Sequence, residues 1–155
     1  MTTPSVLFVC LGNICRSPLA EAAFAREAKA VGMDVFIDSA GTGDWHIGQP
    51  PDKRARAVAK AHGIDIDGYR ARQVTAADFE YFTHMIALDA QNLADLEALR
   101  PEAGTASLSL LLDHVPGREG QSVADPYHGD ARDFEATWDG VLAGAKGLIA
   151  TLASR

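Results

Sequence analysis

The chain has 155 residues, of which 47% are hydrophobic and 23% are charged, and its formal net charge is −7. This length and composition are typical of a single globular domain, which we expect to cover residues 1–155. The acidic balance disfavours nucleic acid as a partner, and no apolar run reaches the ~20 residues that cross a membrane, so neither kind of partner is expected.

The first part of the chain alternates apolar runs with helical patterns. In chain order it predicts a strand at 5–9, a helix at 18–31, a strand at 35–37, a loop at 38–52 and a helix at 52–61. Pro18 suits the first turn of a helix, and Gly32 is typical of the position after a helix end. Asp52 is placed to cap the helix that follows it.

The second part continues the alternation. It predicts a short helical piece from 75, a strand at 85–88, a helix at 89–99, a strand at 108–112, a loop at 113–132 and a helix at 133–153. Thr75 and Asp78 have the spacing of a capping box, and Asp89 suits a helix N-cap. We therefore expect an α/β fold, a three-layer sandwich in which helices cover both faces of a four-stranded parallel sheet.

The segment between the first strand and the first helix reads Cys10-Leu11-Gly12-Asn13-Ile14-Cys15-Arg16-Ser17. In such folds ligands bind at the carboxyl ends of the strands, where this segment lies. Successive N–H groups in a tight turn before a helix form a nest for an anion, so we expect a phosphate loop after the first strand. Its candidate phosphate-binding residues are Leu11, Gly12, Asn13, Ile14, Cys15, Arg16 and Ser17.

Cys10 and Arg16 are the candidate catalytic residues of this loop. Helix N-termini and cations favour a thiolate, which makes Cys10 a candidate nucleophile with Ser17 as its hydrogen-bond donor. Arg16 can hold two phosphate oxygens at once, and Gly12 is expected to give the backbone conformations that other residues resist. The residues alone leave one alternative open, in which Cys10 merely ends a buried strand and Arg16 is solvated on a helix.

Further motifs follow along the chain. They are Asp38-Ser39-Ala40-Gly41-Thr42, Gly48-Gln49-Pro50-Pro51-Asp52, Ala71-Arg72-Gln73, Asp89-Ala90-Gln91-Asn92-Leu93 and Asp125-Pro126-Tyr127. Together with the loop from Val9 to Pro18, they resemble the low-molecular-weight protein tyrosine phosphatases over essentially the whole chain. The resemblance implies an enzyme that hydrolyses phosphotyrosine and other aryl phosphate monoesters through a phosphocysteine intermediate, with inorganic phosphate as product and no cofactor. No Cys/His cluster has metal-ligand spacing, so no metal is expected.

The resemblance assigns the general acid to Asp125. It would protonate the departing phenolate and later act as the base on the water that cleaves phosphocysteine. Pro126 stiffens the chain after Asp125, within a loop expected at the same end of the sheet. From the residues alone, an ordinary turn aspartate before proline is the alternative.

The resemblance also implies an apolar slot for the phenolic ring. Trp45 and Tyr127 are its expected walls and Leu11 its floor, although a tryptophan in a long loop can also fold back onto the core. His46 and His128 neighbour the walls, and they either tune substrate choice or are plain surface histidines.

Asn13, Ser17 and Ser39 resemble residues that hold the phosphate loop in shape through hydrogen bonds. Many relatives carry a histidine in this network where this chain has Tyr69. Either the Tyr69 hydroxyl substitutes for it or the network is rewired. Cys15 is either a small buried residue or, as the resemblance implies, a redox residue that forms a reversible disulfide with Cys10.

Three other functions compete with phosphotyrosine hydrolysis. A thiol-linked arsenate reductase shares this fold and loop, but its relay needs a further cysteine pair, and the chain has only Cys10 and Cys15. A protein arginine phosphatase tends to carry threonine where this chain has Ile14. A non-catalytic phosphopeptide-binding or redox-sensing module would not need Cys10, Arg16 and Asp125 together.

Substrate and location follow from the same features. We expect a phosphotyrosine protein as substrate, and a tyrosine kinase is one candidate by family analogy. With two cysteines and no signal-peptide pattern at Met1-Thr2-Thr3-Pro4, a cytoplasmic location is expected.

Overall fold

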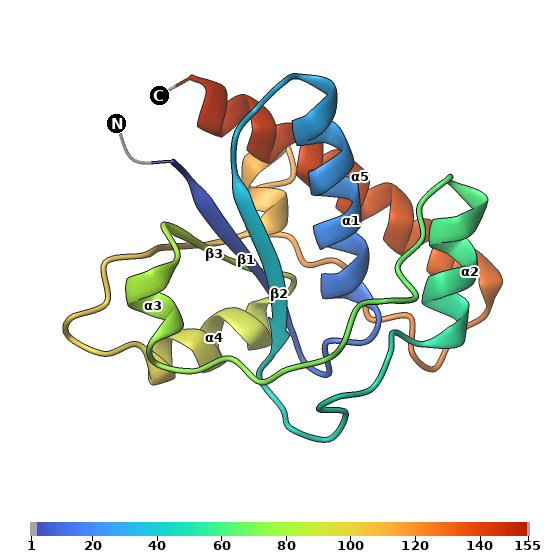
Figure 1. The fold of residues 1–155 in the computed structure, drawn as a ribbon, viewed down its shortest axis with the longest axis horizontal. Helices are drawn as coiled ribbons and strands as arrows, with labels where there is room; N and C mark the ends of the chain where they lie inside the picture. Colours follow the sequence, from blue (N-terminus) through green and yellow to red (C-terminus); the bar gives the residue numbers. More distant parts are fainter. Residues whose placement is uncertain (1–2, 155) are drawn as a thin grey trace.

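The computed structural model describes residues 3–154 and contains one sheet of four parallel strands (Figure 1). The strands are β1 (Ser5–Cys10), β2 (Phe36–Gly41), β3 (His84–Ala87) and β4 (Ser107–Leu110), in the spatial order β2-β1-β3-β4. The helices are α1 (Arg16–Ala30), α2 (Lys53–Ala61), α3 (Asp78–Tyr81), α4 (Ala90–Leu99) and α5 (Ala131–Ala153), with a 3₁₀ helix, η1 (Leu111–His114), after β4. The expected fold class is confirmed.

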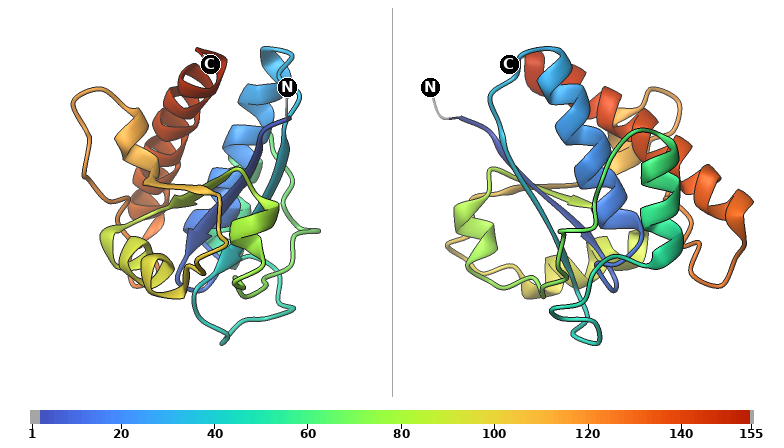
Figure 2. Two further views of the ribbon diagram at one scale, coloured as in Figure 1. Left: turned by 90° about the vertical axis from the view of Figure 1, so that its left-hand side faces the viewer. Right: turned by 45° about the vertical axis from the view of Figure 1, so that its right-hand side comes forward.

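Helices cover both faces of the sheet (Figure 2). Strand β1 is buried along its whole length, and its side chains alternate between the two faces. Val6 and Phe8 join the core under α1, α2 and α5, whereas Leu7 and Val9 join the core under α3 and α4. A strand buried on both faces explains why residues 5–9 form an uninterrupted apolar run.

The order of the strands places a site at the end of β1. The chain passes from β1 to β2 on one side and from β3 to β4 on the other, so the connections that leave these two paired strands run in opposite directions. Their carboxyl ends therefore form a topological switch point. The loop that follows Cys10 starts here and runs directly into the N-terminus of α1. Backbone N–H groups of this loop and of the first turn of α1 therefore lie close together at the carboxyl edge of the sheet.

Several predicted boundaries are confirmed by side-chain caps. Asp52 accepts a hydrogen bond from the Arg54 N–H (2.8 Å), and Asp89 accepts one from the Asn92 N–H (2.7 Å). Gly32 follows α1 in the left-handed region, at φ 69°.

Several predicted boundaries are wrong. Helix α1 starts at Arg16 rather than Pro18, α3 at Asp78 rather than Thr75, and α5 at Ala131 rather than Asp133. Strand β2 continues to Gly41, through residues assigned to a loop, because each of its residues from Phe36 pairs with β1 in register. This pairing overrides the low strand propensity of Asp38 and Gly41. Strand β4 ends at Leu110, since the Asp113 carboxylate accepts the Leu110 N–H (3.0 Å) and the chain turns into η1.

Candidate active site

The loop after β1 curls back over the Cys10 thiol. The Asn13 N–H donates to Cys10 Sγ at 3.3 Å, and Ser17 Oγ lies 3.0 Å from the same sulfur. Asn13 adopts a left-handed backbone conformation, at φ 58°. The expectation that Gly12 supplies the unusual conformation is wrong, because no positive φ occurs there. Gly12 is instead a point of close approach, where a Cβ would lie 3.1 Å from His46 Cδ2.

Arg16 is the first residue of α1, and its side chain is only 3% exposed. Its Nη1 donates to Asp89 Oδ2 at 2.6 Å and to the Val123 carbonyl at 3.0 Å. Burial lowers the pKa of Arg16, but the negative charges of Cys10, Asp89 and Asp125 outweigh it and raise the pKa overall. The guanidinium is therefore a permanent cation in the pocket of the thiol, and its hydrogen bonds to Asp89 and Val123 are both made by Nη1.

Asp89 was predicted only as a helix cap. In the structure Oδ1 caps α4 while Oδ2 binds Arg16, so one carboxylate joins the loop to the end of β3. A usable signal was present, since Asp89 directly follows a predicted strand, at the end of the sheet where ligands bind in such folds.

Asp125 lies in the long loop before α5, and its side chain also approaches the Arg16 guanidinium. Its Oδ1 accepts the Tyr127 N–H at 3.1 Å, and its Oδ2 lies 3.6 Å from Arg16 Nη2. The carboxylate is 45% exposed. The Val123 N–H donates to the Leu88 carbonyl at 2.8 Å, which fixes this segment to the end of β3.

Arg54, on α2, holds the loop of Asp125 from the other side and was not predicted. Its Nη2 donates to the Tyr127 carbonyl (2.9 Å) and its Nη1 to the Gly129 carbonyl (3.2 Å). The guanidinium lies 5.6 Å from the centre of the Tyr127 ring, and its Nε bonds to Asp52 at 3.0 Å.

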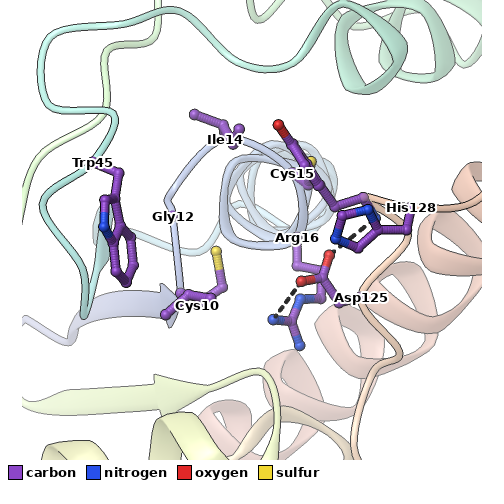
Figure 3. A pocket seen from close by; sticks show the side chains of 10 residues that line it. Cys10, Gly12, Ile14, Cys15, Arg16, Trp45, Asp125 and His128 are labelled. Carbon is purple, nitrogen blue, oxygen red and sulfur yellow. Dashed lines mark hydrogen bonds and ion pairs between the residues drawn. The ribbon is translucent and has the colours of Figure 1, made fainter.

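Cys10, Arg16 and Asp125 share a pocket of about 310 Å³. Figure 3 shows Trp45 on one side of the Cys10 thiol and Asp125 and His128 on the other. The complete lining is Cys10, Leu11, Gly12, Ile14, Cys15, Arg16, Trp45, Asp125, Tyr127 and His128.

The side chains expected to form the walls differ in their placement. Trp45 is 66% exposed at the rim, so it does not fold back onto the core. Tyr127 and His128 line the pocket with their rings in edge-to-face contact, 5.1 Å between centroids. His46 does not line it: its Nδ1 lies 3.0 Å from Gln49 Oε1, and its ring packs beside Gly12. His46 therefore supports the loop from outside the pocket.

A hydrogen-bond network underlies the loop. Asn13 Nδ2 donates to Ser17 Oγ (2.8 Å) and Ser39 Oγ (3.0 Å), and Asn13 Oδ1 accepts the Arg72 N–H (3.0 Å). Ser39 in turn donates to Glu21 Oε1 at 2.6 Å. The network is almost entirely buried, so it couples the loop to α1, β2 and the segment before α3.

Tyr69 does not complete this network. Its ring packs against the core, and none of the hydrogen bonds among residues 3–154 involves its hydroxyl. The network ends instead on Glu21, which sequence reasoning missed. Burial and the nearby Asp38 raise the pKa of Glu21 to about 7, against the lowering effects of Ser39 and Arg72.

Cys15 lies in the same pocket as Cys10, and both thiols are free and buried. Burial, reinforced by the charge of Asp52, raises the pKa of the Cys15 thiol. Cys15 therefore stays protonated at neutral pH.

Residues 3–154 contain no group of three or more His, Cys, Asp or Glu side chains placed to hold a metal ion. None of their helices is both long and apolar enough to cross a membrane.

Comparisons with known proteins agree with this geometry. The family model "Low molecular weight phosphotyrosine protein phosphatase" matches residues 5–155. The low molecular weight protein-tyrosine-phosphatase YfkJ of Bacillus subtilis is 41% identical over 150 residues, covering 96% of this chain and 95% of the relative.

Solved structures share the fold. A protein tyrosine phosphatase of Entamoeba histolytica, crystallised with Hepes in its active site, superposes with a TM-score of 0.91 at 34% identity and covers 97% of both chains. The Drosophila arginine phosphatase DARP superposes with a TM-score of 0.88 at 31% identity, over 95% of this chain and 96% of its own. The family match covers nearly the whole chain, and the sheet, the loop and the pocket agree with it. The chain belongs to the low molecular weight phosphotyrosine protein phosphatase family.

Proposed function

We propose that the chain is a protein tyrosine phosphatase that hydrolyses phosphotyrosine and other aryl phosphate monoesters through a phosphocysteine intermediate. One observation carries the proposal: the Cys10 thiol, the Arg16 guanidinium and the Asp125 carboxylate share a pocket bordered by Trp45 and Tyr127. The pocket thus combines a nucleophile, an anion site, an acid and an aromatic slot.

The first step forms the covalent intermediate. The Cys10 thiolate, which the Asn13 N–H and the Ser17 hydroxyl stabilise, attacks phosphorus. The N–H groups of residues 11–17 and the Nη2 side of the Arg16 guanidinium, which makes no hydrogen bond within residues 3–154 and pairs with Asp125 at 3.6 Å, hold the phosphate oxygens as charge shifts onto the leaving oxygen. Asp125, protonated at this stage, transfers its proton to that oxygen, and the phenol departs.

The second step regenerates the enzyme. The Asp125 carboxylate accepts a proton from a water molecule, whose oxygen attacks the phosphorus of phosphocysteine. The S–P bond breaks, inorganic phosphate leaves, and Cys10 returns to the thiolate.

The lining of the pocket favours an aryl group over a guanidinium. Ile14 lies in the pocket and offers no hydroxyl to a phosphoarginine. Trp45 and Tyr127 instead offer ring surfaces against which a phenolic ring can pack. A phosphotyrosine protein, with a tyrosine kinase as one candidate, is therefore the proposed substrate, and the cytoplasm is the proposed location.

We also propose that Cys15 protects Cys10 from oxidation. Peroxide converts the Cys10 thiolate to a sulfenic acid, and the Cys15 thiol then displaces water from it to form a disulfide, which an external thiol reduces. Peptide mass spectrometry of peroxide-treated protein is expected to find the Cys10–Cys15 bond. In Cys15→Ala the same treatment is expected to leave Cys10 irreversibly oxidised. Activity recoverable by thiol to the same extent in both proteins would contradict this role.

One assay tests the central proposal. The native chain, Cys10→Ser and Asp125→Asn are offered an aryl phosphate, a phosphotyrosine peptide, a phosphoarginine peptide and arsenate. The native chain is expected to hydrolyse the first two, and Cys10→Ser is expected to be inactive on all four. Turnover that survives in Cys10→Ser, or a preference for phosphoarginine or arsenate, would refute the proposal.

A further inference from the structure

A second pocket adjoins the candidate active site, on the far side of Trp45 and Leu11. Its volume is about 330 Å³, close to that of the first pocket. It is lined by Leu11, Thr42, Gly43, Trp45, Gln73, Val74, Asp95 and Leu99. Because Leu11 and Trp45 line both pockets, a peptide whose phosphotyrosine occupies the first can place a flanking side chain in the second.

The floor of this second pocket is built from paired backbone rather than free loop. Gly41 and Gln73 form a parallel bridge beyond the end of β2, and the Val74 N–H donates to the Gly41 carbonyl at 2.8 Å. Gln73 Nε2 donates to the Thr42 carbonyl at 3.2 Å. These bonds fix Gln73 and Val74 beside the end of β2.

The Trp45 wall is fixed by a close approach to the backbone. The indole ring lies directly against Gly43, so that a Cβ at this position would overlap the ring. Glycine is therefore required at 43 for Trp45 to stand between the two pockets.

The chemistry of the second pocket is apolar with one negative charge. Leu11, Trp45 and Leu99 are all exposed hydrophobic side chains. Asp95 is the one charged residue of the lining. Its Oδ1 accepts a hydrogen bond from Gln91 Nε2 at 2.9 Å, and none of the ion pairs among residues 3–154 involves it.

We infer that this second pocket is a substrate subsite for a basic side chain close to the phosphotyrosine. The aliphatic stem of an arginine or lysine packs on Leu99 and on Trp45, whose ring face also attracts a cation, and the charged head pairs with Asp95. An acidic flanking residue is repelled by the Asp95 carboxylate and by the net charge of −7 on the protein. The inference rests on the proposed function, because it names the peptide that the same active site prefers.

Peptide kinetics test the inference. One phosphotyrosine peptide is prepared with arginine, leucine or glutamate at each flanking position in turn, and an aryl phosphate without flanking residues serves as reference. At one position or more, arginine is expected to raise kcat/KM over glutamate by about twofold to fivefold, the range of an exposed charge pair, and added salt is expected to reduce the difference.

Two variants and a matched control assign the preference to Asp95. Asp95→Asn is expected to remove the preference for arginine, and Asp95→Lys to invert it, with unchanged kcat/KM on the aryl phosphate. Asp139→Asn removes an equal charge from the exposed face of α5 and is expected to behave as the native chain. Peptide binding to Cys10→Ser, followed by fluorescence anisotropy, should show the same order and separates affinity from chemistry.

Each contrary outcome has a distinct meaning. A preference that persists in Asp95→Asn, or is lost equally in Asp139→Asn, overturns the subsite in favour of overall charge. A best peptide with leucine overturns the basic occupant. If the native chain hydrolyses the aryl phosphate without any flanking preference, the subsite alone fails, whereas no hydrolysis of any ester removes the proposed function as well.

Discussion

Arg16 and Asp89 form the shortest ion pair of the candidate active site, with 2.6 Å between Nη1 and Oδ2. This ion pair fixes which side of the guanidinium can bind a phosphate. Because Nη1 is engaged by Asp89 and by the Val123 carbonyl, the other side of the guanidinium is presented to the pocket as a fixed fork. Asp89 thereby holds the arginine from outside the lining of the pocket.

Substitution of Asp89 by asparagine tests this positioning. Asparagine caps a helix as well as aspartate does, so the start of α4 should be kept while the charge partner of Arg16 is lost. We expect a loss of about 1–3 kcal/mol in unfolding free energy and a fall in kcat/KM on an aryl phosphate, because a buried cation loses a charged hydrogen bond. Urea unfolding and steady-state kinetics measure both, with Asp139→Asn as the control. Kinetics equal to the native chain would remove Asp89 from the site.

The proposed role of Asp125 as general acid predicts a dependence on the leaving group. Asp125→Asn cannot supply a proton, so kcat for phosphotyrosine should fall by about 10²–10⁴-fold. The fall should be smaller for p-nitrophenyl phosphate, whose phenolate is stable without protonation. Comparison of kcat for the two substrates in both proteins measures this. An equal loss on both substrates would point to damaged binding rather than lost acid catalysis.

Two variants of Asn13 distinguish the contribution of its left-handed backbone from that of its side-chain hydrogen bonds. Asn13→Gly keeps the backbone at φ 58° but loses the hydrogen bonds to Ser17 and Ser39, whereas Asn13→Ala loses the bonds and strains the backbone. Both variants should have lower kcat/KM than the native chain. In urea, Asn13→Ala should be less stable than Asn13→Gly by about 1 kcal/mol. Equal stability of the two variants would contradict a requirement for this conformation.

The network under the loop predicts a pH dependence of stability. Burial and Asp38 raise the pKa of Glu21 from 4.5 to about 7 in the folded protein. The folded state therefore binds more protons than the unfolded state between these values. The contribution of Glu21 to stability is full below pH 4.5 and is lost as the pH rises through about 7.

Glu21→Gln isolates this contribution, because glutamine still accepts the Ser39 hydroxyl proton but does not titrate. Unfolding free energies measured in urea across this pH range should fall more steeply for the native chain than for Glu21→Gln. The difference between the two slopes should disappear above pH 7, where Glu21 is ionised in both states. Parallel curves across the whole range would show that Glu21 is not the group responsible.

Prediction from sequence and the structure differ mainly where a strand or a side chain depends on a partner that is distant in the sequence. The strand assigned to 35–37 continues to Gly41 because β1 pairs with it, and no local pattern at Asp38 and Ser39 indicates this. The helix starts at Asp52 and Asp89 were found because a cap lies next to the helix that it stabilises. Glu21 and Arg54 were missed because their partners Ser39 and Tyr127 come from distant segments.

The amino-acid sequence by itself determined the alternation of strands and helices and the chemistry of the loop from Cys10 to Ser17. Both are local properties, readable from the spacing of apolar residues and from eight consecutive positions. Asp125 was singled out by the family resemblance, but tertiary structure alone decided that Asp89 also faces Arg16, and that Glu21 rather than Tyr69 completes the loop network. A carboxylate acquires such a role from the charges and donors that folding brings beside it, and a single sequence does not record those distances.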